Sequence, residues 1–272
     1  MLEKDVFSGI DFDALLAEQR AASSFGERPA AAWNQRAPKY GSGGSHNDYT
    51  RTVLAGLNLE GVRTVLDIGC GPGNLAVPLA QRVEKVTAID FSEGMLERLR
   101  ERAAEAGVGN IEARNLAWAD EWEGVEAADL ALCSRAMDFA NLRACLAKMD
   151  RMAKVRCCLI LHAGKSYLGE DVMRLLETPI RPRADYIYAV AMLYQAGIQA
   201  SVDFFESGGG MSYGSADEFL ESVRWRIGAL TPGDEGRLRE WYGTLPAGED
   251  GRVKYSHPFR WARMCWEKRR WA

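Results

Sequence analysis

The chain has 272 residues, of which 47% are hydrophobic and 26% charged, and its formal net charge is −4. This composition is typical of a globular protein with one sizeable core, and the acidic balance provides no overall basic field to gather nucleic acid or anionic lipid. No apolar stretch approaches the roughly 18 residues that span a bilayer, and residues 1–30 lack a signal-peptide-like apolar segment. We therefore expect a cytoplasmic protein with neither a membrane nor a nucleic-acid partner.

The N-terminal part, residues 1–50, is predicted to be a helical segment outside the main sheet. Trp33 and Tyr40 lie on one side of a short amphipathic stretch, and the run Gly41–Ser45 is flexible by composition. A helix over residues 47–57 leads into the first strand.

Residues 64–162 alternate between short apolar runs and helical segments. Strands are expected at 64–68, 85–89, 111–116, 129–133 and 155–162, and helices at 74–82, 93–106 and 141–153. Parallel strands joined by helical crossovers form a sheet covered on both faces. This pattern predicts an α/β fold.

The pattern changes after His162. Prolines exclude a regular helix over residues 178–182, whereas helices are expected at 184–196, 215–227 and 233–245, and strands at 198–206 and 259–266. Five of the eight tryptophans follow residue 220. They fit an aromatic cap that forms an acceptor pocket, a dimer surface or a packing layer over the sheet.

The most informative segment is a glycine-rich turn directly after the first predicted strand. Gly69, Gly71 and Gly73 occupy alternate positions, and Asp67 precedes them by two residues. Glycines allow positive φ and let a ligand approach the main chain. Dinucleotide folds instead use a G-x-G-x-x-G turn that binds a pyrophosphate, which Asp67 would repel. The spacing therefore favours a phosphate-free ligand that has an amino group.

A second carboxylate, Asp90, ends the second predicted strand. In ribose-binding Rossmann sites an acidic residue at this place accepts hydrogen bonds from ribose hydroxyls. Phe91 follows and can pack on an adenine edge, and Ser92 is suited to cap the helix that contains Met95.

The segments Val65–Gly73 and Ala88–Leu96 closely resemble the corresponding motifs of the class I S-adenosylmethionine-dependent methyltransferases. The resemblance implies a Rossmann-like, doubly wound, mostly parallel seven-stranded sheet with an antiparallel last strand and a helical insertion between the last two strands. It implies a cofactor-binding core over residues 51–165, and cap helices and closing strands over 166–272. The implied cofactor is S-adenosylmethionine, with S-adenosylhomocysteine as its product.

The resemblance also implies roles for individual residues. Asp67 would lie near the methionyl amino group, Asp90 would bind the ribose, and the turn backbone would cradle the methionyl chain. The family usually has an acidic residue after the third strand that contacts the adenine amino group. In this chain that acid is replaced near Ala117, so the Trp118 backbone and Asp120 are the candidates for the adenine contact. The residues expected to bind the cofactor are Asp67, Gly69, Cys70, Gly71, Gly73, Asp90, Phe91, Met95, Trp118 and Ser134, together with Trp33 and Tyr40 from an N-terminal lid.

The candidates for the acceptor side are Arg135 and His162, at the ends of the fourth and fifth strands. Arg135 can hold an acidic substrate or form a salt bridge; His162 can accept a proton or be a satisfied buried histidine. Alignment of a nucleophile with the sulfonium methyl supplies much of the rate, so a base is needed only if the acceptor loses a proton.

The expected reaction is methyl transfer to a small-molecule acceptor, with a homodimer as one option. Six cysteines without a CxxC pair, and three dispersed histidines, give no metal site. The alternatives are a non-catalytic S-adenosylmethionine-binding protein and a nicotinamide-dependent oxidoreductase.

Overall fold

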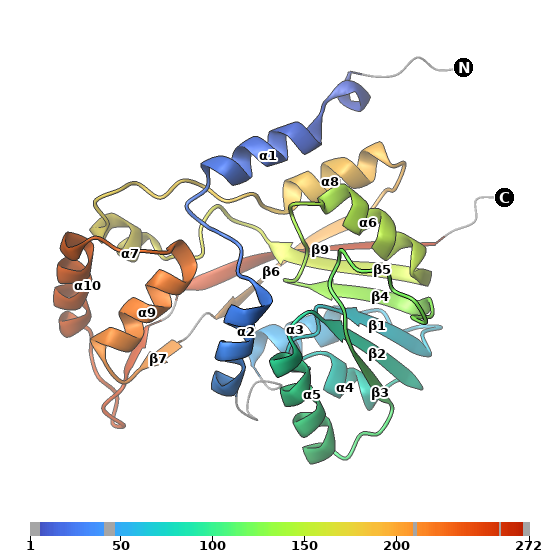
Figure 1. Ribbon diagram of the computed structural model, residues 1–272, viewed down its shortest axis with the longest axis horizontal. Coiled ribbons are helices and arrows are strands. Elements are labelled where there is room, and N and C mark those ends of the chain that lie inside the picture. The colour runs from blue at the N-terminus through green and yellow to red at the C-terminus, as the bar shows by residue number, and fades with distance from the viewer. Residues whose placement is uncertain (1–5, 41–46, 209–210, 256, 269–272) are drawn as a thin grey trace.

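The computed structural model describes residues 6–40, 47–208, 211–255 and 257–268. The run Gly41–Ser45, predicted to be flexible, lies outside them. Figure 1 shows a sheet with helices on both faces, and a smaller cap beside it. Over the described residues, no helix has the length and apolar character needed to cross a membrane.

The main sheet contains seven strands within the described residues, in the order β3-β2-β1-β4-β5-β9-β6. Strands β1 to β5 are mutually parallel, whereas β9 runs antiparallel to both β5 and β6. The Rossmann-like prediction with an antiparallel last strand is therefore confirmed. The strand bounds are Thr64–Ile68 (β1), Lys85–Asp90 (β2), Ile111–Asn115 (β3), Ala128–Ser134 (β4), Ala153–His162 (β5), Ser201–Gly208 (β6) and Pro258–Glu267 (β9).

Helices cover the two faces of the sheet, and the apolar side chains of the central strands point alternately into two cores. One core contains residues of α3, α4 and α5, and the other contains residues of α1, α6 and α8. The bounds are Phe12–Ala22 (α1), Asp48–Gly56 (α3), Ala76–Ala80 (α4), Glu93–Glu105 (α5), Leu142–Arg151 (α6) and Tyr186–Gln195 (α8).

The cap has its own apolar cluster, centred on the buried Phe219. Most of it is inserted between β6 and β9, as predicted, but three of its elements were not predicted. These are helix α7 and a separate two-stranded sheet of β7 and β8. The elements are Glu170–Leu175 (α7), Met211–Tyr213 (β7), Ala216–Ile227 (α9), Pro232–Thr244 (α10) and Val253–Tyr255 (β8). Strands β7 and β8 have only three residues each, which is too short for the alternation of apolar and polar residues to reveal a strand.

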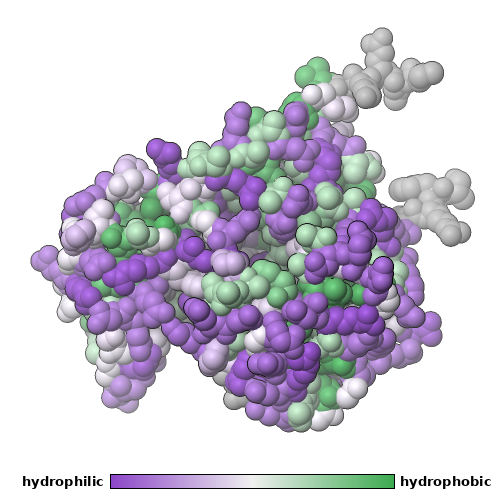
Figure 2. All heavy atoms as spheres, in the orientation of Figure 1, coloured by the Kyte–Doolittle hydropathy of each residue, from purple (hydrophilic) through white to green (hydrophobic). Residues whose placement is uncertain are grey.

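Helix α2 (Ala30–Arg36) lies between the cap and the sheet domain, whereas α1 packs against α8. Pro29 precedes α2, and the chain continues as a single 3₁₀ turn, η2 (Ala37–Lys39). Helix α2 contacts α5, and Figure 1 shows it in front of the sheet, beside α9. In the same orientation, Figure 2 shows hydrophilic residues over most of this face, with hydrophobic residues near its middle.

Candidate active site

The glycine turn follows β1 as predicted, and its glycines have backbone conformations that other residues rarely adopt. The φ angles are 69° at Gly69, 54° at Gly71 and 78° at Gly73. A Cβ atom on Gly69 would lie 2.1 Å from the Cβ of Ala136, whereas one on Gly71 would have no neighbour within 4 Å. Gly69 is thus required for packing against the β4 loop, and Gly71 lines the open side of the turn.

The backbone N–H groups of the turn are used inside the protein. Those of Gly69 and Cys70 both donate to the carbonyl of Ile89, at 2.8 and 3.0 Å. The N–H of Gly73 donates to the Cys70 carbonyl, and that of Gly71 donates to the Asp90 carboxylate. A pyrophosphate site needs free N–H donors. The carboxylates of Asp67 and Asp90 lie beside this turn instead, and they suit a cationic group.

Asp67 supplies an unusual buried carboxylate on β1. Its side chain is 2% exposed, and its Oδ2 has no hydrogen-bond partner among the described residues. Burial, together with the charge of Asp90, raises its pKa from 3.8 to about 7, against a hydrogen bond from the Ala76 backbone. An unpaired buried carboxylate oxygen is costly, so this position favours a ligand that brings a donor or a positive charge.

Asp90 ends β2, as predicted, and its carboxylate joins two backbone segments. Its Oδ1 accepts from the Ser92 N–H at 2.9 Å, and its Oδ2 from the Gly71 N–H at 2.8 Å. Burial raises its pKa, and the hydrogen bonds from the backbone oppose that shift. Each oxygen retains a lone pair for a ligand hydroxyl. Phe91 beside it is 40% exposed.

A buried arginine that the sequence analysis missed fixes the far side of the turn. Arg102 of α5 donates to the Pro72 carbonyl and to the Asn74 side chain, both at 2.8 Å. Its position next to Ala103, on the apolar side of the helix, was the available signal. The side chains of Cys70 and Met95, both predicted to bind cofactor, are buried, and that of Cys70 packs in the core behind the turn.

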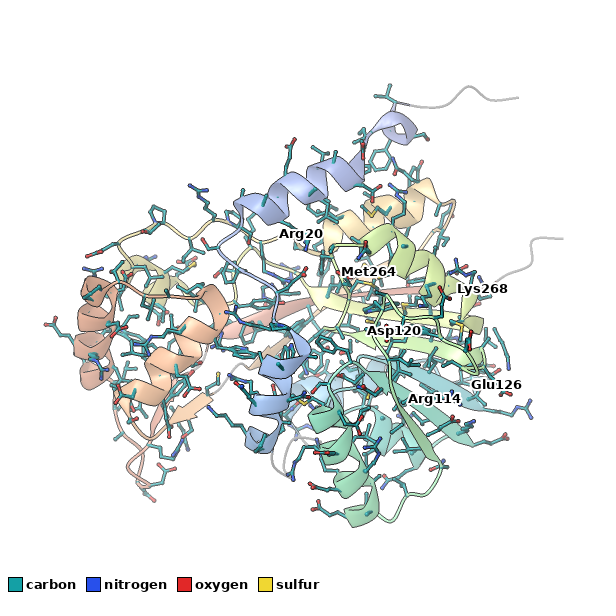
Figure 3. All side chains as sticks on the ribbon, in the orientation of Figure 1. Arg20, Arg114, Asp120, Glu126, Met264 and Lys268 are labelled. Carbon is teal, nitrogen blue, oxygen red and sulfur yellow. The ribbon has the colours of Figure 1, made fainter. Side chains whose placement is uncertain are left out.

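The loop after β3 lies next to the loop after β4. Asp120, in the β3–β4 connection (Figure 3), accepts from the Ala117 N–H at 2.8 Å. The Trp118 indole donates to the Ala136 carbonyl at 2.7 Å. Asp120 and Trp118, which were predicted to approach an adenine ring, therefore hold the loop after β3 in place. Trp118 also links this loop to Ala136, which packs against Gly69.

Arg135 follows β4 and is the one described non-glycine residue with a positive φ, at 63°. Its guanidinium lies 4.0 Å from the centre of the Tyr49 ring and 5.5 Å from that of Trp261. No carboxylate of the described chain forms a salt bridge with it. Backbone strain in a site loop is typical of functional positions.

Tyr49 was not predicted as a site residue. Its hydroxyl lies 2.5 Å from the Ser134 hydroxyl, so Ser134 is engaged by α3. Burial raises the pKa of Tyr49 to about 12, although the charge of Arg135 lowers it. The phenol thus stays neutral and fixes the end of β4.

His162 is buried at the end of β5. Burial, together with the charge of Arg183, lowers its pKa to about 4. Its Nδ1 lies 3.1 Å from the Gly164 carbonyl, which can only accept, so Nδ1 carries the proton and Nε2 keeps its lone pair. The ring packs 4.7 Å from Tyr167.

The predicted lid residues, Trp33 and Tyr40, lie on α2 and at the end of η2, where both contact other parts of the protein. The Trp33 ring packs against Trp225 of α9 at 5.2 Å, and Tyr40 contributes its backbone carbonyl, which accepts from Arg98. Asn34 makes the principal contact, accepting from the Ser92 hydroxyl at 2.7 Å and from the Gly94 N–H at 3.0 Å. The segment is thus fastened to the N-terminus of α5, beside Asp90.

Comparison with known proteins identifies this architecture. A family model described as a methyltransferase domain matches residues 65–156, which include the glycine turn and Asp90. The crystal structure of BH2331, a candidate methyltransferase of Bacillus halodurans C-125, shares the fold with a TM-score of 0.54 at 19% identity, over 81% of this chain and 98% of that one. The chain therefore contains a methyltransferase domain on a Rossmann-like fold.

The chain is similar along nearly its whole length to an uncharacterized protein of Haemophilus influenzae. The two are 32% identical over 261 residues, which cover 94% of this chain and 96% of the relative. The 23S rRNA methyltransferase RlmD of Chromohalobacter salexigens is 32% identical over 127 residues, but these make up only 26% of that protein.

Proposed function

We propose that this methyltransferase acts on a small-molecule acceptor and binds its cofactor between the ends of β1 and β2. The observation that supports the site most strongly is the buried, unpartnered Oδ2 of Asp67 beside Asp90. A cationic amino-acid end matches this pair of carboxylates, whereas a pyrophosphate would be repelled by it.

The residues divide between the two ends of the cofactor. Asp67 and the carbonyl groups of the turn would hold the methionyl amino group, and Asp90 would accept the ribose hydroxyls. The exposed Phe91 ring would pack on the adenine. When bound, S-adenosylmethionine supplies a methyl group already activated by its sulfonium.

Arg135 and His162 would serve the acceptor. Arg135 is held on an aromatic ring without a carboxylate partner in the described chain, so it is available to orient an acidic acceptor. His162 keeps its Nε2 lone pair and can take a proton, but a pKa of about 4 makes it a weak base. We divide the chain into a lid (1–50), a core (51–165) and a cap (166–272). The cap would cover the acceptor side of the core.

The cofactor site is tested by calorimetric titration of the purified chain with S-adenosylhomocysteine, with NADH as the comparison. We expect saturable binding of S-adenosylhomocysteine and none of NADH. Absence of binding by S-adenosylhomocysteine would refute the site.

The acceptor class is tested with methyl-labelled S-adenosylmethionine and two substrate pools, a small-metabolite extract and purified ribosomal RNA. Label is expected in the metabolite fraction. Label found in RNA alone would overturn the small-molecule assignment and favour RNA methylation, as in RlmD.

A further inference from the structure

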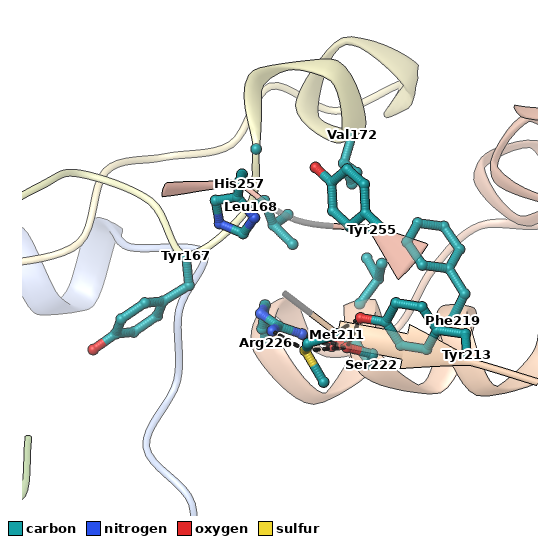
Figure 4. A pocket seen from close by; sticks show the side chains of 12 residues that line it. Tyr167, Leu168, Val172, Met211, Tyr213, Phe219, Ser222, Arg226, Tyr255 and His257 are labelled. Atoms are coloured by element: carbon teal, nitrogen blue, oxygen red, sulfur yellow. Dashed lines mark hydrogen bonds between the residues drawn. The ribbon is translucent and has the colours of Figure 1, made fainter. Parts of the chain in front are cut away.

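The cap contains a pocket that the cofactor site does not use. It lies among α7, α9 and the β7–β8 sheet, and it measures about 280 Å³ with its open mouth included. Its enclosed interior has room for about one water-sized group, and the rest of the space is open to solvent. Its polar lining includes Tyr167, Tyr213, Ser222, Arg226, Tyr255 and His257. In Figure 4 the Arg226 guanidinium and the His257 ring lie on facing sides of this space.

Arg226 is largely buried and has no carboxylate partner in the described chain. Its Nη1 donates to the carbonyl and the hydroxyl of Ser222, and its Nη2 donates to the Met211 sulfur at 3.1 Å. Burial lowers its pKa, and the positive charge of Arg36 lowers it further. A thioether is a weak acceptor for a guanidinium. An anion in the pocket would compensate this charge, for which the described residues supply hydrogen-bond acceptors but no carboxylate.

His257 adds two further unused polar atoms. Neither its Nδ1 nor its Nε2 has a hydrogen-bond partner among the described residues, although both atoms are buried. Burial and Arg226 lower its pKa, while the Tyr167 backbone and Asp171 raise it. Asp171 is already engaged, because it accepts from the Tyr255 hydroxyl at 2.6 Å and from the Val172 N–H at 2.8 Å.

Aromatic contacts connect this pocket to the end of β5. The Tyr167 ring lies 4.7 Å from the His162 ring, and the His257 ring lies 4.4 Å from that of Phe259. Phe259 is in turn 5.8 Å from His162. A further guanidinium, that of Arg183, stacks 4.1 Å from Tyr167 and has a buried Nη1 with no described partner.

We propose that Arg226 and His257 bind the carboxylate of the acceptor, so that the substrate class is a small carboxylic acid. The acid group would enter the cap pocket, and the methyl-accepting end would extend past Tyr167 towards Arg135. The proposal rests on the proposed function, since it names the acceptor of that reaction. Guanidinium and imidazole donors that face one space match the charge and the hydrogen-bond acceptors of a carboxylate.

The test uses benzoate as the probe and benzamide as its neutral counterpart, added to the full chain saturated with S-adenosylhomocysteine. Saturation-transfer NMR should show saturable binding of benzoate, competition by acetate, and no binding of benzamide. Arg226→Gln should weaken benzoate binding about tenfold or more. His257→Gln, whose smaller change spares the guanidinium, should weaken it less.

Arg239→Gln is the matched control, because Arg239 pairs with Asp217 on the surface of the cap. It should bind benzoate as the unchanged chain does. Equal affinities of Arg226→Gln and Arg239→Gln, or the absence of saturable benzoate binding, would overturn the proposal. Displacement of benzoate by inorganic phosphate but not by acetate would also overturn it, in favour of a phosphate site.

S-adenosylhomocysteine binding is measured separately in the same samples by thermal shift. If it binds while benzoate does not, the carboxylate proposal fails and the cofactor site stands. If it does not bind, the proposed function fails independently of benzoate.

Discussion

The Asp90 carboxylate accepts a hydrogen bond from the Gly71 backbone N–H at 2.8 Å. The end of β2 is thereby tied to the turn after β1, although 19 residues separate the two positions. The same carboxylate that is proposed to bind ribose therefore also shapes the turn.

Asp90→Ala should weaken S-adenosylhomocysteine binding by roughly 1–3 kcal/mol, because charge-assisted hydrogen bonds to the ribose and to the turn are both lost. Asp90→Asn keeps one acceptor oxygen, so it should weaken S-adenosylhomocysteine binding less than Asp90→Ala does. Calorimetry measures both, and an unchanged affinity for Asp90→Ala would reject the ribose assignment.

Asp67 should make both stability and cofactor binding depend on pH. Its pKa is about 7 in the folded chain against 3.8 ordinarily. Between these values the folded state holds a proton that the unfolded state has released, so the free energy of unfolding falls as pH rises through this window. The ligand amino group favours the ionised form, so S-adenosylhomocysteine affinity should instead fall as pH drops below about 7.

Asp67→Asn removes this titration. Compared with the unchanged chain, it should gain stability at about pH 8 in the absence of ligand, and its ligand affinity should be lower and flat across the window. Denaturant titrations at about pH 5 and pH 8, with and without S-adenosylhomocysteine, measure both effects. Identical pH profiles for the two proteins would contradict the role given to this carboxylate.

Gly69 and Gly71 should respond differently to added side chains. Gly69→Ala puts a Cβ 2.1 Å from that of Ala136, so the chain should lose stability through this clash in addition to backbone strain. Gly71→Val has open space but an unfavourable φ, which costs about 1–2 kcal/mol. It should leave a folded protein that no longer binds S-adenosylhomocysteine. Normal binding by Gly71→Val would refute close approach of the ligand to the turn.

Asn34 should control the position of the N-terminal segment. Asn34→Ala removes the acceptor for Ser92 and Gly94, and should cost roughly 1–3 kcal/mol of docking energy. We expect faster amide hydrogen exchange over residues 30–40 and weaker S-adenosylhomocysteine binding. The exposed neighbour Gln35, changed to Ala, is the control; equal exchange in both variants would argue against this anchoring contact.

The order of strands and helices in the core, the glycine turn, and the positions of Asp67 and Asp90 followed from the sequence alone. Strand and helix periodicities are local properties, and the carboxyl ends of parallel strands meet at one edge, so residues at those ends are predictable neighbours.

Tertiary structure decided the contacts between distant segments. Tyr49 meets Ser134 across 85 residues, and Asn34 meets Ser92 across 58. It also showed that the N–H groups of the turn point inwards and that Arg226 faces a pocket without a carboxylate partner in the described chain. Such contacts depend on how packed elements are placed in space, and the spacing of residues along the chain does not encode that placement.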